Sequence, residues 1–503
     1  MHNPPHEEIL QSPISKDLET NLSLLKTLLY LPQNQDVVLR RCQCRGFDLC
    51  VVYVEGMADD KKISEFILHA CKSPDNVYVP EAERISLLIS DYIEVAQCDP
   101  QSSLKKILAG ILGGMTAVVV DGADEMLLME TRGFAHRPVN KPLNESVVMG
   151  AQEGFVENLR TNITLVRRYL QSPQLITERY TIGVGIPTAI ALIYLDGVVN
   201  QDALDEARRR LKSIQSPTVQ SIGAIQQLIE DSPRSLFPQM LQTERPDRAA
   251  SCLTEGQFVI LSENAPYALT APVTLFHLIH SPDDTFLRWQ YASFLRIIRI
   301  AGILLSLLLP GMYVALTLHH SHIIPFTLLL SIAETRIDVP FSILAEVLVM
   351  DFAFYLINEA STRIPSQIGA TISIVGALIL GQAAVSASII SPMLIIIVAL
   401  TGLGNFATPN YSFGLSIVLY RITLVLAGGL LGLYGLLAAL LLMTLRLCSL
   451  HSFGVPYLAP VAPKRPHNPD ILLRLSLFRQ KKPMYFAQKN NWLYHRRNES
   501  PCD

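Results

Sequence analysis

The stretch from Ile364 to Tyr420 lacks Asp, Glu, Lys, Arg and His altogether. Water-soluble domains seldom leave so long a run without charge, and a helix that crosses a bilayer needs about 20 mainly apolar residues. Arg363 and Arg421 bound the run. We therefore predict that it holds at least one membrane span and is long enough for two.

The sequence also lacks the signatures of several other protein classes. The first residues show no charged segment followed by an apolar core and a cleavage site, so we expect the soluble part to stay in the cytoplasm. Cys42 and Cys44 have no second half with metal-ligand spacing, which argues against a metal site. The glycines of residues 110–116 and 183–185 lack the rest of a phosphate-binding fingerprint. We predict no cofactor and no enzymatic activity.

Charge is distributed unevenly along the chain, because nearly all of it lies before Arg299 or after Arg446. The formal net charge of −3 gives no reason to expect nucleic acid as a partner. We predict six regions in order: residues 1–34 (N-terminal helix and extension), 35–145 (first cytosolic α/β subdomain), 146–174 (connecting helix), 175–282 (second cytosolic α/β subdomain), 283–450 (helical transmembrane domain) and 451–503 (basic cytoplasmic tail).

The two α/β subdomains are predicted to be copies of one unit. Each contains a strand, turn and helix pattern followed later by a β-hairpin pattern. Tyr53 matches Tyr194 and Val118 matches Val259, both at an offset of 141. A constant offset for both patterns favours an internal repeat. The predicted fold class is therefore α+β with a membrane part: two repeated cytosolic α/β subdomains followed by an α-helical multi-pass transmembrane domain.

Residues 153–173, between the subdomains, are predicted to form a helix with apolar residues on one face. Arg160, Arg167 and Arg168 lie elsewhere on it. Two interpretations stay open: a solvated helix that bridges the subdomains, or an arginine face that docks a neighbouring subunit.

The membrane part begins with residues 300–318, a charge-free first span preceded by Arg288, Arg296 and Arg299. Because positive residues favour the cytoplasmic side, this span is predicted to run outward. Residues 341–357 are a second span. Residues 412–446 exceed one span and predict either a tilted long helix or a helical hairpin bent at Gly428 and Gly429. A cytoplasmic tail requires an even number of spans, four or six.

Charged residues near the uncharged stretch have two possible roles. Placing an ionised carboxylate at the bilayer centre costs about 2.5 to 3.5 kcal/mol or more of free energy. Each acid in this part of the chain should therefore face protein or water. Arg336 and Arg363 are candidates to pair structurally with these acids. The alternative role is to attract cations along a path, and the candidates for it are Glu334, Glu346, Asp351 and Glu359.

Several long motifs resemble the A subunit of the GerA-type spore germinant receptors. They occur in this order: FPQMLQTERPDR (237–248), FLRIIR (294–299), LPGMYVAL (309–316), NEASTRIPSQIG (358–369), ISIVGALILGQAAV (372–385) and SFGVPYLAP (452–460). The resemblance implies a nutrient receptor subunit in the inner membrane of a dormant bacterial spore. It also implies a transporter-like B subunit and a lipoprotein C subunit as partners. Members of the family are expected to form a homo-oligomeric channel, a pentamer, that releases monovalent cations when the complex senses a germinant.

A helix over residues 366–391 would present two different faces. The face opposite the predicted pore, which includes Gly376 and Ala384, is small enough for close helix packing. Hydrophobic constrictions can gate a channel by dewetting. We therefore expect the other stripe, polar at its ends and apolar in the middle, to line a pore: Gln367, Thr371, Ile374, Leu378, Gln382 and Ser386. The alternative is that the whole helix is packing core.

Three functions remain open at this stage. The first is a subunit of a gated ion channel. The second is a secondary transporter or permease, because the breaks at Pro392 and at residues 402–404 resemble the interrupted helices of transporter sites. No inverted repeat of several helices is found in this short membrane part, which counts against it. The third is a receptor scaffold that conducts nothing.

Overall fold

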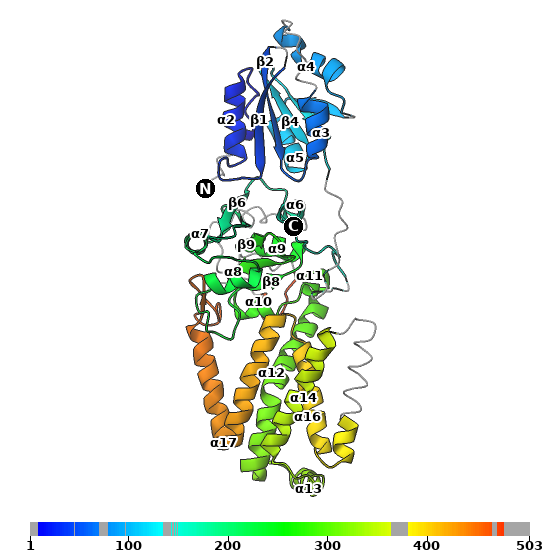
Figure 1. Ribbon diagram of the computed structural model, residues 1–503, viewed down its shortest axis with the longest axis vertical. Helices are drawn as coiled ribbons and strands as arrows, with labels where there is room; N and C mark the ends of the chain where they lie inside the picture. The colour runs from blue at the N-terminus through cyan, green and yellow to red at the C-terminus, as the bar shows by residue number, and fades with distance from the viewer. Residues whose placement is uncertain are drawn as a thin grey trace, which may run out of the picture. The chain divides into compact units, whose positions relative to one another are not determined.

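The computed structural model describes residues 9–44, 46–69, 79–95, 97–133, 142, 145, 147, 149–363, 381–464 and 470–476. Its contacts divide the chain into two compact units. The first holds most of residues 1–272 and the second, the helical unit, holds residues 231–239 and 273–480. Each is described by itself below (Figure 1).

The first unit begins with a sheet in the strand order β1-β2-β4-β5-β3, in which every pairing is antiparallel. The elements of this first subdomain are α2 (Leu18–Leu28), β1 (Val37–Cys44), β2 (Phe47–Val54), α3 (Asp60–Lys62), η1 (Ile63–Leu68), η3 (Glu81–Glu83), α4 (Arg84–Leu87), η4 (Leu88–Tyr92), β3 (Cys98–Gln101), α5 (Leu104–Leu112), β4 (Thr116–Val120) and β5 (Met126–Met129).

The second subdomain repeats this order of strands as β6-β7-β9-β10-β8, again antiparallel throughout. The predicted internal repeat is confirmed by the shared strand order. Its elements are α6 (Leu159–Tyr169), β6 (Leu175–Ile182), β7 (Thr188–Leu195), α7 (Gln201–Lys212), α8 (Ile222–Ile229), β8 (Leu241–Thr243), α9 (Pro246–Thr254), β9 (Phe258–Ser262) and β10 (Ala268–Ala271).

The register of the strands corrects one predicted match. Strands β2 and β7 correspond at the offset of 141. In β4, however, Val118 lies opposite Val51, whereas the equivalent residue of β7, Leu192, lies opposite Ile260. Val118 therefore corresponds to Ile260 and not to Val259, because the second subdomain carries one more residue between the two strands.

Both faces of the first sheet are covered, which explains why its central strands are buried along their length. Alternate residues of β4 point to opposite faces. Val119 packs with α2 and α5 on one side, and Val118 packs with η1 and η4 on the other. Helix α2 therefore belongs to the core of the first subdomain and is not a separate extension, as residues 1–34 were predicted to be.

The helical unit contains α10 (Leu275–Ile279), α11 (Asp283–Phe286), α12 (Trp289–His319), η5 (Ser321–Ile323), α13 (Phe326–Glu334), α14 (Ile343–Arg363), α16 (Pro392–Phe406), α17 (Tyr411–Ser449), β11 (His451–Ser452) and β12 (Val455–Pro456). Residues 381–386 are also helical. Among the described residues, α12 and α17 are long and apolar enough to cross a membrane, and α16 is a shorter apolar helix.

Helix α17 is a hairpin and not one long tilted helix. Gly432 has φ 62° and ψ −145°, a conformation that favours glycine, and it separates two helical arms, 411–431 and 433–449 (Figure 1). A Cβ atom at this position would lie 2.6 Å from Cε1 of His320. The predicted hairpin is therefore present, but its bend lies at Gly432 and not at Gly428 and Gly429.

Helix α12 is the central helix of this unit because glycines let two neighbours approach its backbone. A Cβ atom on Gly404 of α16 would lie 2.3 Å from the carbonyl oxygen of Gly302. A Cβ atom on Gly428 of α17 would lie 2.7 Å from the carbonyl oxygen of Gly311. Small residues at helix crossings are typical of close packing between apolar helices.

Residues 451–463 fold back onto the helical unit and are not part of a free tail. The hydroxyl of Ser452 donates to the carbonyl of Gln239 at 2.7 Å, and that of Tyr457 donates to the carbonyl of Pro238 at 2.8 Å. In the same segment of residues 231–239, Phe237 stacks on Tyr420 of α17 with ring centroids 4.7 Å apart. The predicted boundary at residue 451 therefore cuts through packed structure.

We predict that Gly404→Ala destabilises the helical unit by about 1–3 kcal/mol, because the added methyl group meets backbone atoms of α12 that have no free space to enter. Thermal unfolding of the purified full chain in detergent measures the loss. Gly223→Ala is the matched control, since nothing lies within 4 Å of the added Cβ and alanine favours the helix. Equal melting temperatures for Gly404→Ala and the parent chain would contradict this packing.

Candidate functional site

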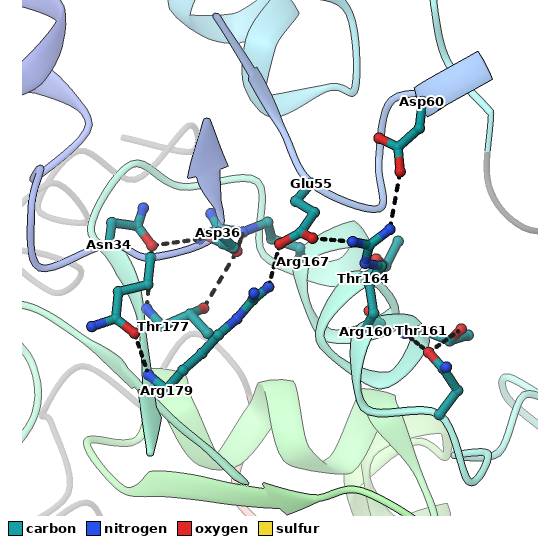
Figure 2. A network of polar contacts seen from close by, with 12 residues as sticks. Asn34, Asp36, Glu55, Asp60, Arg160, Thr161, Thr164, Arg167, Thr177 and Arg179 are labelled. Atoms are coloured by element: carbon teal, nitrogen blue, oxygen red, sulfur yellow. Dashed lines mark hydrogen bonds and ion pairs between the residues drawn. The ribbon is translucent and has the colours of Figure 1, made fainter. Parts of the chain in front are cut away.

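A buried ion pair joins the two subdomains within the first unit (Figure 2). Arg167 of α6 donates from Nε and Nη2 to the two carboxylate oxygens of Asp36, at 2.6 and 2.7 Å. The same Nη2 reaches the side-chain oxygen of Asn34 and the carbonyl of Leu175, each at 3.1 Å. Asp36 and Asn34 lie directly before β1. One arginine of the second subdomain therefore fixes the backbone where the first sheet begins.

Helix α6 directs Arg167 toward Asp36 because a cap at its first turn and apolar packing along its buried face fix its position. Asn158 caps its first turn by accepting from the backbone N–H of Thr161 at 3.0 Å. Its apolar residues, among them Leu159 and Val166, pack into the core of the second sheet. The helix is therefore part of the second subdomain, and two of its arginines, Arg160 and Arg167, contact the first.

A second, more exposed cluster centres on Glu55, at the end of β2. Its carboxylate pairs with Arg160 of α6 and with Arg179 of β6, and Arg160 also reaches Asp60 at 3.0 Å (Figure 2). Next to it, Gly56 has φ +84°, and a Cβ atom there would lie 2.5 Å from Oγ1 of Thr164. Glycine is thus required where the two subdomains approach.

The bridging interpretation of α6 is confirmed, but the expectation of a solvated helix is wrong for one arginine. Arg167 and Asp36 are each only 1% exposed. Burying such a pair is costly unless every polar group is well partnered. The alternative role, docking a neighbouring subunit, is not available to Arg167 because its guanidinium is enclosed within this chain.

The sequence prediction missed a network of polar contacts that holds residues 145–151, between the two subdomains, against the second subdomain. Glu145 accepts from the hydroxyl of Thr243 and pairs with Arg248. Arg245, fully buried, donates to the carbonyls of Glu145 and Ala151 at 3.1 and 2.9 Å. The signal was present in the charged run of residues 243–248, which was used only for the family resemblance. Its alternating charges could have indicated a buried polar network.

In the helical unit, Glu346 of α14 is buried and lies against two groups. It forms an ion pair with Arg336, one of the two arginines predicted for structural pairing. Its other oxygen, Oε1, accepts from the backbone N–H of Ser391 at 2.5 Å. Arg336 also donates to the carbonyl of Phe341 at 3.1 Å. The carboxylate therefore lies inside the protein.

Asp351 of α14 is also buried, and its partner differs from the two that the sequence suggested. Nε of Arg421, in the first arm of α17, lies 3.1 Å from its carboxylate. The Arg421 guanidinium also stands over the ring of Tyr355 at 5.2 Å. The side chain of Arg363, the other predicted partner, lies outside the described residues.

The remaining two predicted acids are exposed. Glu334 is at the end of α13, and Glu359 is in the last turns of α14. The structure thus divides the four acids into an exposed pair and a buried pair held by arginines.

Four residues of the predicted pore stripe lie outside the described residues: Gln367, Thr371, Ile374 and Leu378. The other two, Gln382 and Ser386, are exposed on the helix of residues 381–386. Between them, Ala384 is turned inward and packs against an apolar cluster that includes Ile390 and Leu394. Over this short helix, Gln382, Ala383 and Ser386 are exposed, whereas Ala384 is partly buried.

Metal chemistry has little support among the described residues. Within those ranges, no three His, Cys, Asp or Glu side chains are grouped closely enough to hold a metal ion. Burial raises the pKa of the Cys50 thiol to about 11, so it stays protonated at neutral pH.

Comparison with known proteins gives consistent matches over most of the chain. Residues 24–485 match the model of the Bacillus/Clostridium GerA spore germination protein family. "Spore germination protein KA" of Bacillus subtilis (strain 168) is 36% identical over 453 residues, 90% of this chain and 82% of that protein. "Spore germination protein A1" of the same organism is 34% identical over 451 residues, 90% of this chain and 92% of that protein.

A solved structure also matches part of the chain. It is the N-terminal domain of the A subunit of the Bacillus megaterium spore germinant receptor GerK3, with 26% identity and a TM-score of 0.41. The match covers 52% of this chain and 96% of that one.

We predict that Asp36→Ala destabilises the first unit by about 3–5 kcal/mol, because it leaves the Arg167 guanidinium buried without its counter-charge. Denaturant unfolding of the full chain measures the change. Arg41→Ala is the control, since it breaks an ion pair with Glu19 whose two side chains are 58% and 62% exposed, and it should lower the stability far less. Similar losses in the two variants would contradict a structural role for the buried pair.

Proposed function

Because the chain belongs to the Bacillus/Clostridium GerA spore germination protein family, we propose that it is the A subunit of a germinant receptor and forms an oligomeric gated ion channel. The channel releases monovalent cations to start germination. It assembles as a homo-oligomer, a pentamer, with a transporter-like B subunit and a lipoprotein C subunit. It resides in the spore inner membrane, with the N-terminal subdomains and the C-terminal tail in the cytoplasm.

The observation that carries this proposal is the two-faced helix of residues 381–386 within the uncharged stretch. Gln382 and Ser386 are exposed while Ala384 packs inward. In an oligomer arranged around an axis, the exposed polar face of such a helix is suited to water and the small face to its own subunit. The absence of charge from Ile364 to Tyr420 fits an apolar gate, where a fixed charge would keep the pore wet.

Exposed apolar side chains on the helical unit support a membrane location. In water such a surface would be an interaction site. A bilayer or further copies of the chain would cover this apolar surface and keep it out of water. In the second arm of α17 these side chains, all more than half exposed, are Tyr434, Leu437, Leu441, Leu442 and Leu445.

The exposed acids are the better candidates to attract cations. Glu346 and Asp351 are buried inside the protein, so an ion in solution cannot reach their carboxylates. Glu334 and Glu359 are exposed at helix ends, where rings of carboxylates from several subunits can raise the local cation concentration. We propose that selectivity arises there and that gating arises in the uncharged stretch.

Current recording from the purified chain in a planar bilayer tests the function. Discrete conductance steps carried by potassium support the channel. Saturable solute flux without steps would identify a transporter instead, and the absence of both would leave a non-conducting scaffold. The last two outcomes each overturn the proposal.

We predict that Leu378→Ala or Ile374→Ala raises the resting leak of potassium, because a smaller side chain widens an apolar constriction and lets water persist in it. Flux of potassium from vesicles that contain the chain measures the leak. Ala384→Val, on the small face, is the matched comparison and should change stability more than leak. A leak that rises with Ala384→Val and not with the two truncations would show that the faces are reversed.

A further inference from the structure

Within the uncharged stretch, a short junction at residues 387–391 is held in place by a residue of another helix. The helix of residues 381–386 stops, Ser388 adopts φ 50°, and the N–H of Ile389 returns to the carbonyl of Ala384 at 2.9 Å. Ser391 is then extended, with φ −75° and ψ 143°, and Pro392 begins α16. Residues 387–391 thus connect the helix with the proposed pore face to α16.

This junction lacks the usual local cap. Ser391 is the N-cap residue of α16, but its side chain makes no capping hydrogen bond. Instead its backbone N–H donates to Oε1 of Glu346, which comes from the neighbouring helix α14. In a capping box, a Glu in the first turn of the same helix accepts from the N-cap N–H. Here a residue 45 positions away does so, and its negative charge also suits the N-terminus of α16.

Glu346 joins three segments through one carboxylate. Its second partner, Arg336, lies in the connection after α13 and also donates to the carbonyl of Phe341. The Glu346 side chain is 0% exposed. An ionised group at such a site is stable only while its partners remain, so a movement of the junction away from α14 would leave the carboxylate underpaired.

We propose that Glu346 is a positioning residue that holds the junction at Ser391 and thereby keeps the channel closed at rest. The inference rests on the proposed channel function. The ion pair with Arg336 orients the carboxylate and neutralises it. The bond to the Ser391 N–H fixes the end of the helix that carries Gln382 and Ser386. Opening therefore requires this bond to lengthen or break.

Three variants separate the bond to the junction from the ion pair. Glu346→Leu has a similar size and removes both. Glu346→Gln keeps an oxygen that accepts from the Ser391 N–H but loses the charge. The exchange Arg336→Glu with Glu346→Arg restores opposite charges, although an arginine at position 346 has no acceptor for the Ser391 N–H.

The experiment records the open probability of the full chain in bilayers without germinant. We expect Glu346→Leu and the charge exchange to raise it about tenfold or more, since a hydrogen bond to a charged group stabilises the closed state by about 1.4 kcal/mol or more. Glu346→Gln should raise it less. Asp470→Asn is the control, because it weakens another ion pair of this unit, with Arg296 near the start of α12. It should leave the resting open probability unchanged.

Two results would overturn the inference: a charge exchange as tightly closed as the parent chain, or a Glu346→Leu channel with normal resting closure. Hydrogen–deuterium exchange of a peptide covering residues 387–394 gives a second readout that needs no conduction. Faster exchange there in Glu346→Leu and not in Asp470→Asn supports the bond to Ser391, and unchanged exchange refutes it. If the parent chain carries no current, the channel proposal fails while this exchange test still decides the role of Glu346.

Discussion

The structure depends on three buried carboxylates that each pair with an arginine from a different segment: Asp36, Glu346 and Asp351. An ionised group in an apolar interior is costly when alone, so its partner must be adjacent wherever it is placed. Asp36 and Arg167 fix one subdomain against the other in the first unit. In the helical unit, Asp351 ties α14 to α17 and Glu346 ties α14 to the start of α16. Apolar packing and close glycine contacts hold α12 against its neighbours, and the ion pairs fix α14 beside them.

Much of the fold follows from patterns within short stretches of sequence. The repeat, the connecting helix and the uncharged run depend on local periodicity and composition, and the strand order and helices agree with them. The Arg336–Glu346 pair was also accessible, because its members are ten positions apart. Arg421 as the partner of Asp351 was not, since only the packing of α17 against α14 brings together residues 70 positions apart. A buried arginine such as Arg167 has the same sequence signature as a solvated one.

Other differences arise because the sequence leaves equivalent choices open. Gly428, Gly429 and Gly432 could each permit a bend, and only the backbone angles of the folded chain show that Gly432 adopts it. In the candidate site, local sequence patterns likewise could not predict which two of the four acids are buried and which two are exposed. It follows from which turn of each helix faces a neighbour. The junction bond between Ser391 and Glu346 involves a backbone N–H, which has no sequence signature at all.

The proposed pore requires the polar face of the uncharged stretch to meet its counterparts from other copies of the chain around an axis. Photo-cross-linking in membranes tests it most directly, with a photoreactive amino acid placed at Gln382 in one sample and at Ala384 in another. The account predicts covalent dimers of the chain from position 382 and cross-links within one chain from position 384. Lipid adducts at position 382 without covalent dimers would contradict it.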